Sequence, residues 1–114
     1  MAYDLVLSER VRDALAQTPR VEEKKMFGGL AFMVDDKMCV TVSRDRLMCR
    51  IDPALHEQVL ARKGTQRVIM NQREYTGYVY VGEEGWRDPA DFDYWIGLAL
   101  DYNKHAKASS KKKR

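Results

Sequence analysis

The residues of this chain best suited to nucleophilic or metal chemistry are two cysteines, Cys39 and Cys49, and two histidines, His56 and His105. None of them belongs to a metal-binding spacing such as CxxC or HxxxH, so the sequence does not favour a zinc site. A cysteine nucleophile needs a histidine beside it in space. That chemistry would require Cys39 or Cys49 to meet His56 in the folded chain.

Three pairs of adjacent carboxylates are the candidates for acid–base catalysis: Glu22–Glu23, Asp35–Asp36 and Glu83–Glu84. All three fall on a predicted edge strand or in predicted turns, where side chains are solvated. Neighbouring side chains on a strand also point to opposite faces of the sheet, so such a pair does not form a dyad. The sequence therefore predicts no catalytic constellation, and we expect a non-enzymatic protein that uses no metal or cofactor.

A glycine pair in the stretch KKMFGGLAFMVDDKMCV, residues 24–40, is a candidate phosphate-binding loop. Such a loop runs into the N-terminus of a helix, whose free N–H groups face the anion. Here Gly28 and Gly29 precede five apolar residues typical of a strand, and no GK[ST] or third glycine follows. The motif Met26, Phe27, Gly28, Gly29 is therefore interpreted as a structural bend between two strands, with a positive φ expected at Gly29.

The segments 38–43 and 46–51 predict a hairpin with a well-specified register, joined by Arg44–Asp45. If Ser43 faces Arg46, one face carries only apolar pairs: Val42 with Leu47, Val40 with Cys49, and Met38 with Ile51. The other face pairs Thr41 with Met48 and Cys39 with Arg50. A slip of one residue would destroy this segregation. The two cysteines then lie on opposite faces, so we expect no disulfide between them.

Cys39 is the one thiol for which this register leaves a reactive role open. A guanidinium close to Cys39 would lower the pKa of its thiol and favour the nucleophilic thiolate. Unreactive cysteines are far commoner than activated ones, and Cys49, on the apolar face, is expected to behave as a small hydrophobic residue. The sequence is compatible with either role for Cys39.

Three helices and six strands are predicted along the chain. The first helix carries Leu7, Val11 and Leu15, is capped by Asp4 or Ser8, and stops at Pro19. The second helix begins at Asp52–Pro53 and ends at Gly64, and the third begins at Asp88–Pro89 after the loop GEEGWRDP. Strands are predicted at residues 21–27, 30–34, 38–43, 46–51, 67–70 and 78–81, the last two separated by the polar NQREYTG. The order α–β–β–β–β–α–β–β–α predicts an α+β domain, with a mostly antiparallel sheet of about six strands and helices packed on one face.

The excess positive charge of the chain is concentrated at its C-terminal end. The chain holds 20 Lys and Arg against 17 Asp and Glu. Six of the basic residues and none of the acidic ones fall in the last twelve residues, so residues 1–102 carry 14 basic and 17 acidic side chains. We therefore expect a single, slightly acidic domain over residues 1–107 and a basic disordered tail over 108–114.

No segment of the sequence points to a membrane or to export. The longest apolar run, Leu30–Val34, is far shorter than the roughly 20 residues that cross a bilayer. The N-terminal stretch MAYDLVLSERVRD carries Asp4 and Glu9 within its apolar part, unlike a signal peptide. Two cysteines in such a chain indicate reduced thiols, so we expect a cytoplasmic protein.

The outer face of the predicted hairpin brings basic and aromatic side chains together. Arg46 and Arg50 lie on it with Met48 between them, and basic residues near the glycine bend add charge. Two tyrosines share one face of a later strand, as in a base-stacking platform. The candidate interaction surface is Lys24, Lys25, Arg46, Met48, Arg50, Tyr78 and Tyr80. The alternative is a solvated sheet face with ordinary cross-strand pairs.

The order of these motifs resembles the TfoX N-terminal domain family. The shared features are the basic approach with MFGG, the strand LMCRID, and the late YVYV strand before a final amphipathic helix. The resemblance extends over roughly Leu5 to Lys107. It implies a bacterial regulator of transcription, because TfoX (Sxy) acts with the cAMP receptor protein to activate competence genes. Full-length regulators also carry a C-terminal domain of DNA-binding-like character, and the 114 residues match the first domain alone.

Three functions are compatible with the sequence, and a regulatory protein-interaction module is favoured. An exposed strand, Val21–Lys25, and a sheet face with Met33, Cys39 and Met48 suit a protein partner or a second copy of the chain. The second function is weak, nonspecific and salt-sensitive nucleic-acid binding through the outer sheet face and the basic residues Lys111, Lys112, Lys113 and Arg114. The third is a small-molecule-binding or catalytic domain.

Overall fold

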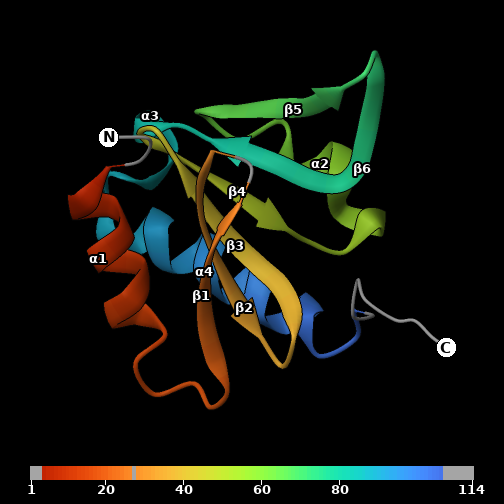
Figure 1. The fold of residues 1–114 in the computed structure, drawn as a ribbon. Coiled ribbons are helices and arrows are strands. Elements are labelled where there is room, and N and C mark those ends of the chain that lie inside the picture. The colour runs from red at the N-terminus through yellow and green to blue at the C-terminus, as the bar shows by residue number, and fades with distance from the viewer. Residues whose placement is uncertain (1–3, 27, 107–114) are drawn as a thin grey trace, which may run out of the picture.

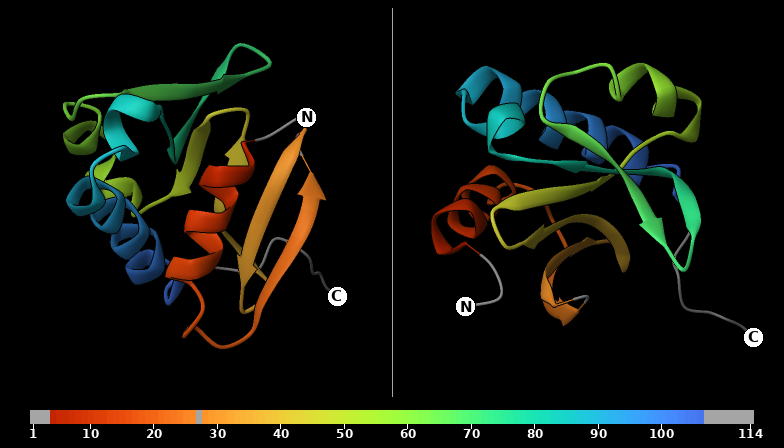
Figure 2. Two further views of the ribbon diagram at one scale, coloured as in Figure 1. Left: turned by 90° about the vertical axis from the view of Figure 1, so that its left-hand side faces the viewer. Right: turned by 90° about the horizontal axis from the view of Figure 1, so that it is seen from above.

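The fold of the computed structural model, which describes residues 4–26 and 28–106, is a six-stranded antiparallel sheet with helices packed on one face (Figures 1 and 2). The strand order is β1-β2-β3-β4-β6-β5. The strands are β1 (Val21–Met26), β2 (Gly29–Val34), β3 (Lys37–Ser43), β4 (Arg46–Arg50), β5 (Thr65–Met70) and β6 (Arg73–Val81). The helices are α1 (Leu5–Ala14), the 3-10 helix η1 (Pro53–Leu55), α2 (His56–Val59), α3 (Glu83–Trp86) and α4 (Pro89–Asn103). The predicted α+β class and the antiparallel sheet are confirmed.

The core lies between the sheet and the helices. One buried cluster takes side chains from α1, α2, α3 and α4, and it includes the fully buried Phe32 of β2 and Trp95 of α4. Apolar side chains on the opposite face of the sheet form a second, smaller cluster that contains strand residues only. The prediction that the helices gather on one face is therefore confirmed for the described residues, and the second face is left without a helical cover.

Tight two-residue turns connect two pairs of consecutive strands. Asp35 and Asp36 (φ 57° and 64°) join β2 to β3, and Asn71 and Gln72 (φ 53° and 65°) join β5 to β6. A positive φ at both positions is the type I′ geometry, whose twist matches that of the flanking strands. The prediction that all of NQREYTG separates the last two strands is wrong, because only its first two residues form the turn and β6 already begins at Arg73.

The helix starts are set by aspartates, as expected. The Asp4 carboxylate accepts a hydrogen bond from the backbone N–H of Leu7 (3.1 Å), and that of Asp52 accepts one from Ala54 (2.9 Å). The prediction that GEEGWRDP is a loop is only partly right, because this segment contains the short helix α3. The indole N–H of Trp86 in that helix donates to the carbonyl of Asp45 (3.0 Å), which ties α3 to the turn between β3 and β4.

The predicted β3–β4 register is confirmed, but a bulge in β3 changes its first residues. Val42 lies opposite Leu47 and Val40 opposite Cys49, as expected. In the pairing with β2, Val40 faces Phe32 and Met38 faces Met33, so Cys39 is an extra residue on β3. One extra residue reverses the alternation of side chains. Cys39 therefore joins Cys49 in the helix-side core and Met38 lies on the opposite face, so the predicted positions of both residues are wrong.

The glycine pair joins two antiparallel strands, as its interpretation as a structural bend requires. Met26 of β1 pairs with Gly29 of β2 across the turn. The positive φ falls at Gly28 (+72°) and not at Gly29, where it was expected. Gly29 is needed for another reason: a side-chain carbon there would collide with the backbone carbonyl of Val42. Phe27 of the motif lies outside the described residues, as does the predicted tail, 108–114.

Strand β6 turns a corner at Gly77, and this corner curls the sheet. Val79 pairs with Arg67 of β5, but the next pair along the strands joins Glu74 to Ile69, so four residues of β6 lie between the two pairs. Gly77 sits in this irregular stretch with φ +92° and is buried. Figure 1 shows the tip of the β5–β6 hairpin swinging toward the viewer's right, away from α4. None of the helices in the described ranges is long and apolar enough to cross a membrane.

Candidate functional site

Five of the chain's six methionines line one hollow on the face of the sheet that the helices leave uncovered. Each comes from a different strand: Met26 from β1, Met33 from β2, Met38 from β3, Met48 from β4 and Met70 from β5. The sixth strand, β6, contributes Tyr75 and Tyr78, and β4 also contributes Arg50. The hollow has a volume of about 280 Å³. We call this side of the sheet the concave face.

The curl of the sheet makes the face concave. Strands β1 and β5 are the two edges of the sheet, yet Met26 of β1 and Met70 of β5 line the same hollow. A second hollow of about 280 Å³ adjoins it, lined by Thr41, Ser43, Met48, Met70 and Tyr80. Met48 and Met70 line both hollows, so the two hollows adjoin, and we call them together the groove. Flexible, polarizable methionine side chains adapt to irregular partners, which makes such a groove a versatile binding surface.

The structure brings most of the predicted interaction surface together on the concave face. Met48 lies opposite Tyr80 and Arg50 opposite Tyr78 on β4 and β6. The guanidinium carbon of Arg46 lies 3.7 Å from the ring centroid of Tyr80, and that of Arg50 lies 5.7 Å from the ring centroid of Tyr78. These are cation–π contacts. The predicted tyrosine platform therefore has a guanidinium over each of its rings.

The two predicted lysines separate onto opposite faces of β1. Lys24 pairs with Ala31, which belongs to the concave-face cluster, and Lys25 pairs with Leu30, which belongs to the helix-side core. The side chains of a strand alternate between faces, so only Lys24 shares the concave face. Including Lys25 in one surface with Arg46 and Arg50 was therefore wrong.

Sequence reasoning missed four residues of the five-methionine hollow: Met26, Met38, Met70 and Tyr75. Met38 was misplaced by the unrecognised bulge at Cys39, and Tyr75 by the assignment of its segment to a loop. One signal was present in the sequence, because every predicted strand except the last has a methionine in it or at its end. That regularity becomes a surface only when the curl brings β1 and β5 to the same hollow.

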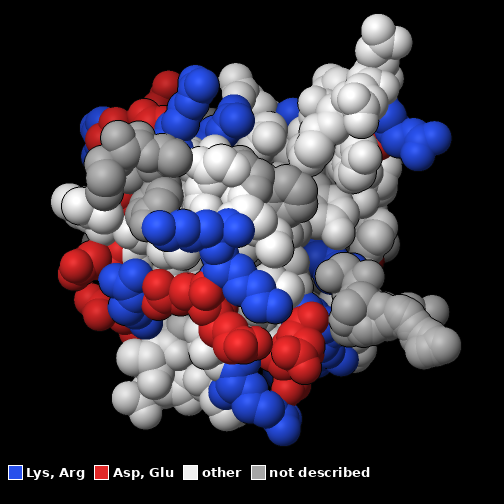
Figure 3. Space-filling view, in the orientation of Figure 1, with Lys and Arg blue, Asp and Glu red and all other residues white. Residues whose placement is uncertain are grey.

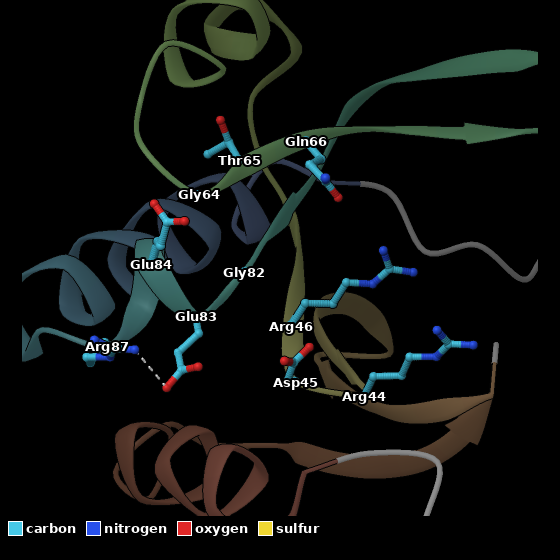
Figure 4. A pocket seen from close by; sticks show the side chains of 10 residues that line it. All are labelled: Arg44, Asp45, Arg46, Gly64, Thr65, Gln66, Gly82, Glu83, Glu84 and Arg87. Atoms are coloured by element: carbon cyan, nitrogen blue, oxygen red, sulfur yellow. Dashed lines mark ion pairs between the residues drawn. The ribbon is translucent and has the colours of Figure 1, made fainter.

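A polar hollow of about 610 Å³ lies at one end of the sheet. Figure 4 shows Arg44 and Arg46 extending side by side from the β3–β4 turn, away from Glu83 and Arg87, which form an ion pair (3.2 Å). The described residues that line this polar hollow carry three guanidinium groups and three carboxylates (Arg44, Asp45, Arg46, Glu83, Glu84 and Arg87). Because these charges balance, the hollow as a whole selects neither anions nor cations.

Burial dominates the chemistry of both cysteines. Cys39 is 1% exposed, and burial raises the pKa of its thiol to about 12, although the nearby guanidinium of Arg50 acts in the opposite direction. Burial also raises the pKa of Cys49, and the neighbouring Cys39 adds to the rise. Both are free thiols. The expected effect of Arg50 on Cys39 is present, but it is the smaller of the two effects, so neither thiol is activated as a thiolate in this structure.

His56 uses both of its ring nitrogens to hold the corner of β6. Its Nδ1 accepts a hydrogen bond from the backbone N–H of Gly77 (3.0 Å), and its Nε2 lies 2.7 Å from a carboxylate oxygen of Glu74. Because Nδ1 accepts, the ring proton is on Nε2 and is donated to Glu74. Arg67 forms ion pairs with Glu74 and with Glu57 (2.6 and 2.9 Å). The cluster His56, Glu57 and Glu74 has the composition of a metal site, but its ligand atoms are engaged in these bonds.

The same cluster makes stability depend on pH at the acidic end. The pKa of Glu74 is lowered, first by its hydrogen bond with His56 and second by that with Arg67. A carboxyl whose pKa is lower in the folded protein adds stability that is complete above its ordinary pKa. That stability is lost as the pH falls through the lowered pKa.

We expect His56→Ala to destabilise the domain by about 3 kcal/mol, because it leaves the buried N–H of Gly77 unpaired and opens a cavity. His56 is 3% exposed. The matched control is His105→Ala at the chain's other histidine, which is exposed and should change stability by less than about 0.5 kcal/mol. Urea unfolding followed by circular dichroism measures both. Equal unfolding midpoints for the two variants would show that His56 does not hold the corner.

Two of the three acidic pairs, Glu22–Glu23 and Asp35–Asp36, lie on an edge strand and in a turn as predicted, whereas Glu83–Glu84 lies in the helix α3 and not in a turn. Glu23 on the helix side of β1 forms an ion pair with Arg12 of α1 (2.6 Å). Its neighbour Glu22 pairs with Met33 and so faces the other way. Asp35 lies 2.5 Å from Arg20 in another ion pair. These carboxylates stabilise turns and strand edges.

Comparison with known proteins assigns the family. A family model described as the TfoX N-terminal domain matches residues 13–102, which include all six strands and most of α4. A search among curated proteins found no match. The matched region also contains all five methionines of the groove and the glycine turn between β1 and β2. Because the model matches most of the chain, this protein belongs to the TfoX N-terminal domain family.

Proposed function

We propose that this protein is a non-enzymatic regulatory module that binds another protein through the concave face of its sheet. The observation that carries the proposal is the groove of five methionines, one from each of five strands, on a face that no described helix covers. Met33, Met38 and Met48 are buried at the base of this groove, and Met26 and Met70 are half-buried. A hollow lined by apolar side chains on an uncovered sheet face suits a binding surface. We place this role in the cytoplasm, where both thiols stay reduced.

The family supports a regulatory role. The resemblance noted above associates TfoX-type proteins with transcriptional control of competence, which relies on contact with a partner protein. The burial of both cysteines and the hydrogen-bonded state of His56 supply no activated nucleophile or base among the described residues. Binding is therefore a better account of the concave face than catalysis.

The tyrosines of the concave face argue for a protein partner over a nucleic acid. A base stacks on the open face of an aromatic ring. The guanidinium groups of Arg46 and Arg50 already lie over Tyr80 and Tyr78, so stacked bases would have to displace them. The groove beside these rings is lined by thioethers and aromatic rings, which suit apolar side chains of a protein.

The test is an affinity purification of the tagged protein from its native cells, with and without nuclease. We expect a partner that survives nuclease and that is lost with Met70→Glu, because Met70 lines both hollows of the groove. The matched control is Ile69→Glu on the same strand. Ile69 is 59% exposed and pairs with Glu74, whose carboxylate contacts His56 on the helix side. The side chain of Ile69 therefore lies on the side of the strand that faces away from the groove.

Loss of all bound material on nuclease treatment would contradict the proposal and favour nucleic acid. Retention of the same partner by Met70→Glu and by Ile69→Glu would contradict the assignment to the concave face. The two variants are matched because each places one new carboxylate on the same edge strand. Circular dichroism spectra and urea midpoints check that both are folded.

A further inference from the structure

The concave face is basic on a domain that is otherwise slightly acidic. Four basic residues have strand partners or ring contacts on this face: Lys24, Arg46, Arg50 and Arg73, the last opposite Met70. Among the described strand residues of this face, Glu22 is the only carboxylate. It lies near the far end of β1, beside the Asp35–Asp36 turn. Residues 1–102 as a whole carry more acidic than basic side chains, so the basic character is local to this face.

The distribution of charge is visible in the surface view. Figure 3 shows acidic side chains gathered at the left and lower centre, whereas the upper right, over β5 and β6, is mostly uncharged or basic. Within the groove itself, Arg50 is the one charged residue among the eight described residues that line the five-methionine hollow. An apolar group entering this hollow therefore meets thioethers and rings, with positive charge at the border.

Arg46 carries a hydrogen-bond donor that is buried and unused. Its Nε has no hydrogen-bond partner among the described residues and is shielded from solvent. The guanidinium is held over the ring of Tyr80, which lines the second hollow, and Arg46 itself lines the polar hollow next to it. Buried polar groups are nearly always hydrogen-bonded, and an arginine fork matches the geometry of a carboxylate. The Nε itself is shielded, but Arg46 as a whole is only half-buried, so its guanidinium is a candidate contact for an acidic group of a ligand.

We infer that the concave face binds an acidic segment of a partner protein, with a bulky apolar side chain in the methionine groove and a carboxylate on Arg46. The inference rests on the proposed function and adds the chemistry of the partner. Each hollow, at about 280 Å³, is at the small end of the range for ligand sites and suits side chains rather than a large cofactor.

Charge argues against two other occupants of the groove. Residues 107–114 of the chain, KASSKKKR, carry five basic residues and no acidic one, so like charges would oppose their binding to this face. A symmetric dimer formed through the concave face would bring the basic face of one copy against the basic face of the other. A partner segment rich in Asp and Glu meets neither difficulty.

The test uses three synthetic peptides and the full chain labelled with ¹³C in its methionine methyl groups. The first peptide alternates Leu or Phe with Asp and Glu, the second has Lys in place of the acids, and the third has Ser in place of Leu and Phe. We expect only the first to shift the methyl signals of Met33, Met38, Met48 and Met70.

Arg46→Gln should weaken the binding of the first peptide about tenfold, since a hydrogen bond to a charged group is lost. Arg87→Gln, which removes an equal charge from the far wall of the polar hollow, should leave affinity within about twofold.

Other results overturn the inference. Equal binding of the basic peptide, or of the Ser peptide, would remove the acidic or the apolar requirement. Tighter binding of a single-stranded oligonucleotide at the same methyl groups would assign the face to nucleic acid. Absence of binding by all three peptides would reject an acidic protein segment as the ligand of this face. If the partner from native cells still depends on Met70 but not on Arg46, the proposed function stands and the acidic class fails. If it does not depend on Met70, the proposed function fails as well.

Discussion

Gly29→Val is expected to destabilise the domain by about 3 kcal/mol or more and to leave little folded protein at 37 °C. A side-chain carbon at residue 29 collides with the backbone carbonyl of Val42, and lies only 3.1 Å from the Cα of Ser43. Because the obstacle is backbone of the neighbouring strand, it cannot move aside as a flexible side chain does. Strands β2 and β3 would separate where the core begins. Overpacking of this kind costs 1–3 kcal/mol or more, against a total stability of about 5–15 kcal/mol.

The neighbouring glycine is the control for this prediction. Gly28 has a positive φ, but no atom lies within 4 Å of the position that a side-chain carbon would take. Asparagine tolerates this backbone conformation better than other residues, so Gly28→Asn should cost less than about 1 kcal/mol. Urea midpoints of the two variants decide the matter. A Gly29→Val protein as stable as Gly28→Asn would show that β2 and β3 do not approach as closely as described.

Val42→Asp is expected to unfold the domain outright. Val42 is fully buried and lies between Leu30 of β2 and Leu47 of β4, in the cluster that also contains the helices. An unpaired carboxylate at this position loses its hydration and gains no partner, so it costs about 4 kcal/mol or more. Lys25→Asp on the exposed strand β1 introduces the same side chain and should change stability by less than about 1 kcal/mol. A cooperative thermal transition of Val42→Asp near that of the unchanged protein would contradict the β3 register.

The elements that the sequence predicts well are those specified by local chemistry. Asp4, Asp52 and Asp88 each precede a helix as expected, and the register of β3 and β4 follows from the apolar alternation around the Arg44–Asp45 turn. Both signals depend on residues close together in the chain. The short helix α3 was missed because four residues carry too weak a periodicity to separate a helix from a loop.

The candidate site was only partly predictable, because single-residue irregularities decide which side chains share a face. The predicted hairpin register placed Arg46, Met48 and Arg50 on one face, and strand alternation placed Tyr78 and Tyr80 together; the pairing of β4 with β6 that joins the two groups was not predicted. The bulge at Cys39 exchanged the faces of Cys39 and Met38, and the sequence carries no clear mark of it. The corner at Gly77, held by His56, brings Met70 and Tyr75 to the groove through contacts 21 residues apart in the chain. Such contacts become visible only in the folded structure.

The most direct test of the central claim is site-specific photo-cross-linking in native cells, with benzoylphenylalanine placed on either side of one hairpin. At position 75 the probe replaces Tyr75, which is 36% exposed and lines the groove, and at position 69 it replaces the exposed Ile69 on the other side. We predict a cross-link to one protein from position 75, no such product from position 69, and loss of the product when Met70→Glu is added. A cross-link to the same partner from position 69 but not from position 75 would contradict binding through the concave face.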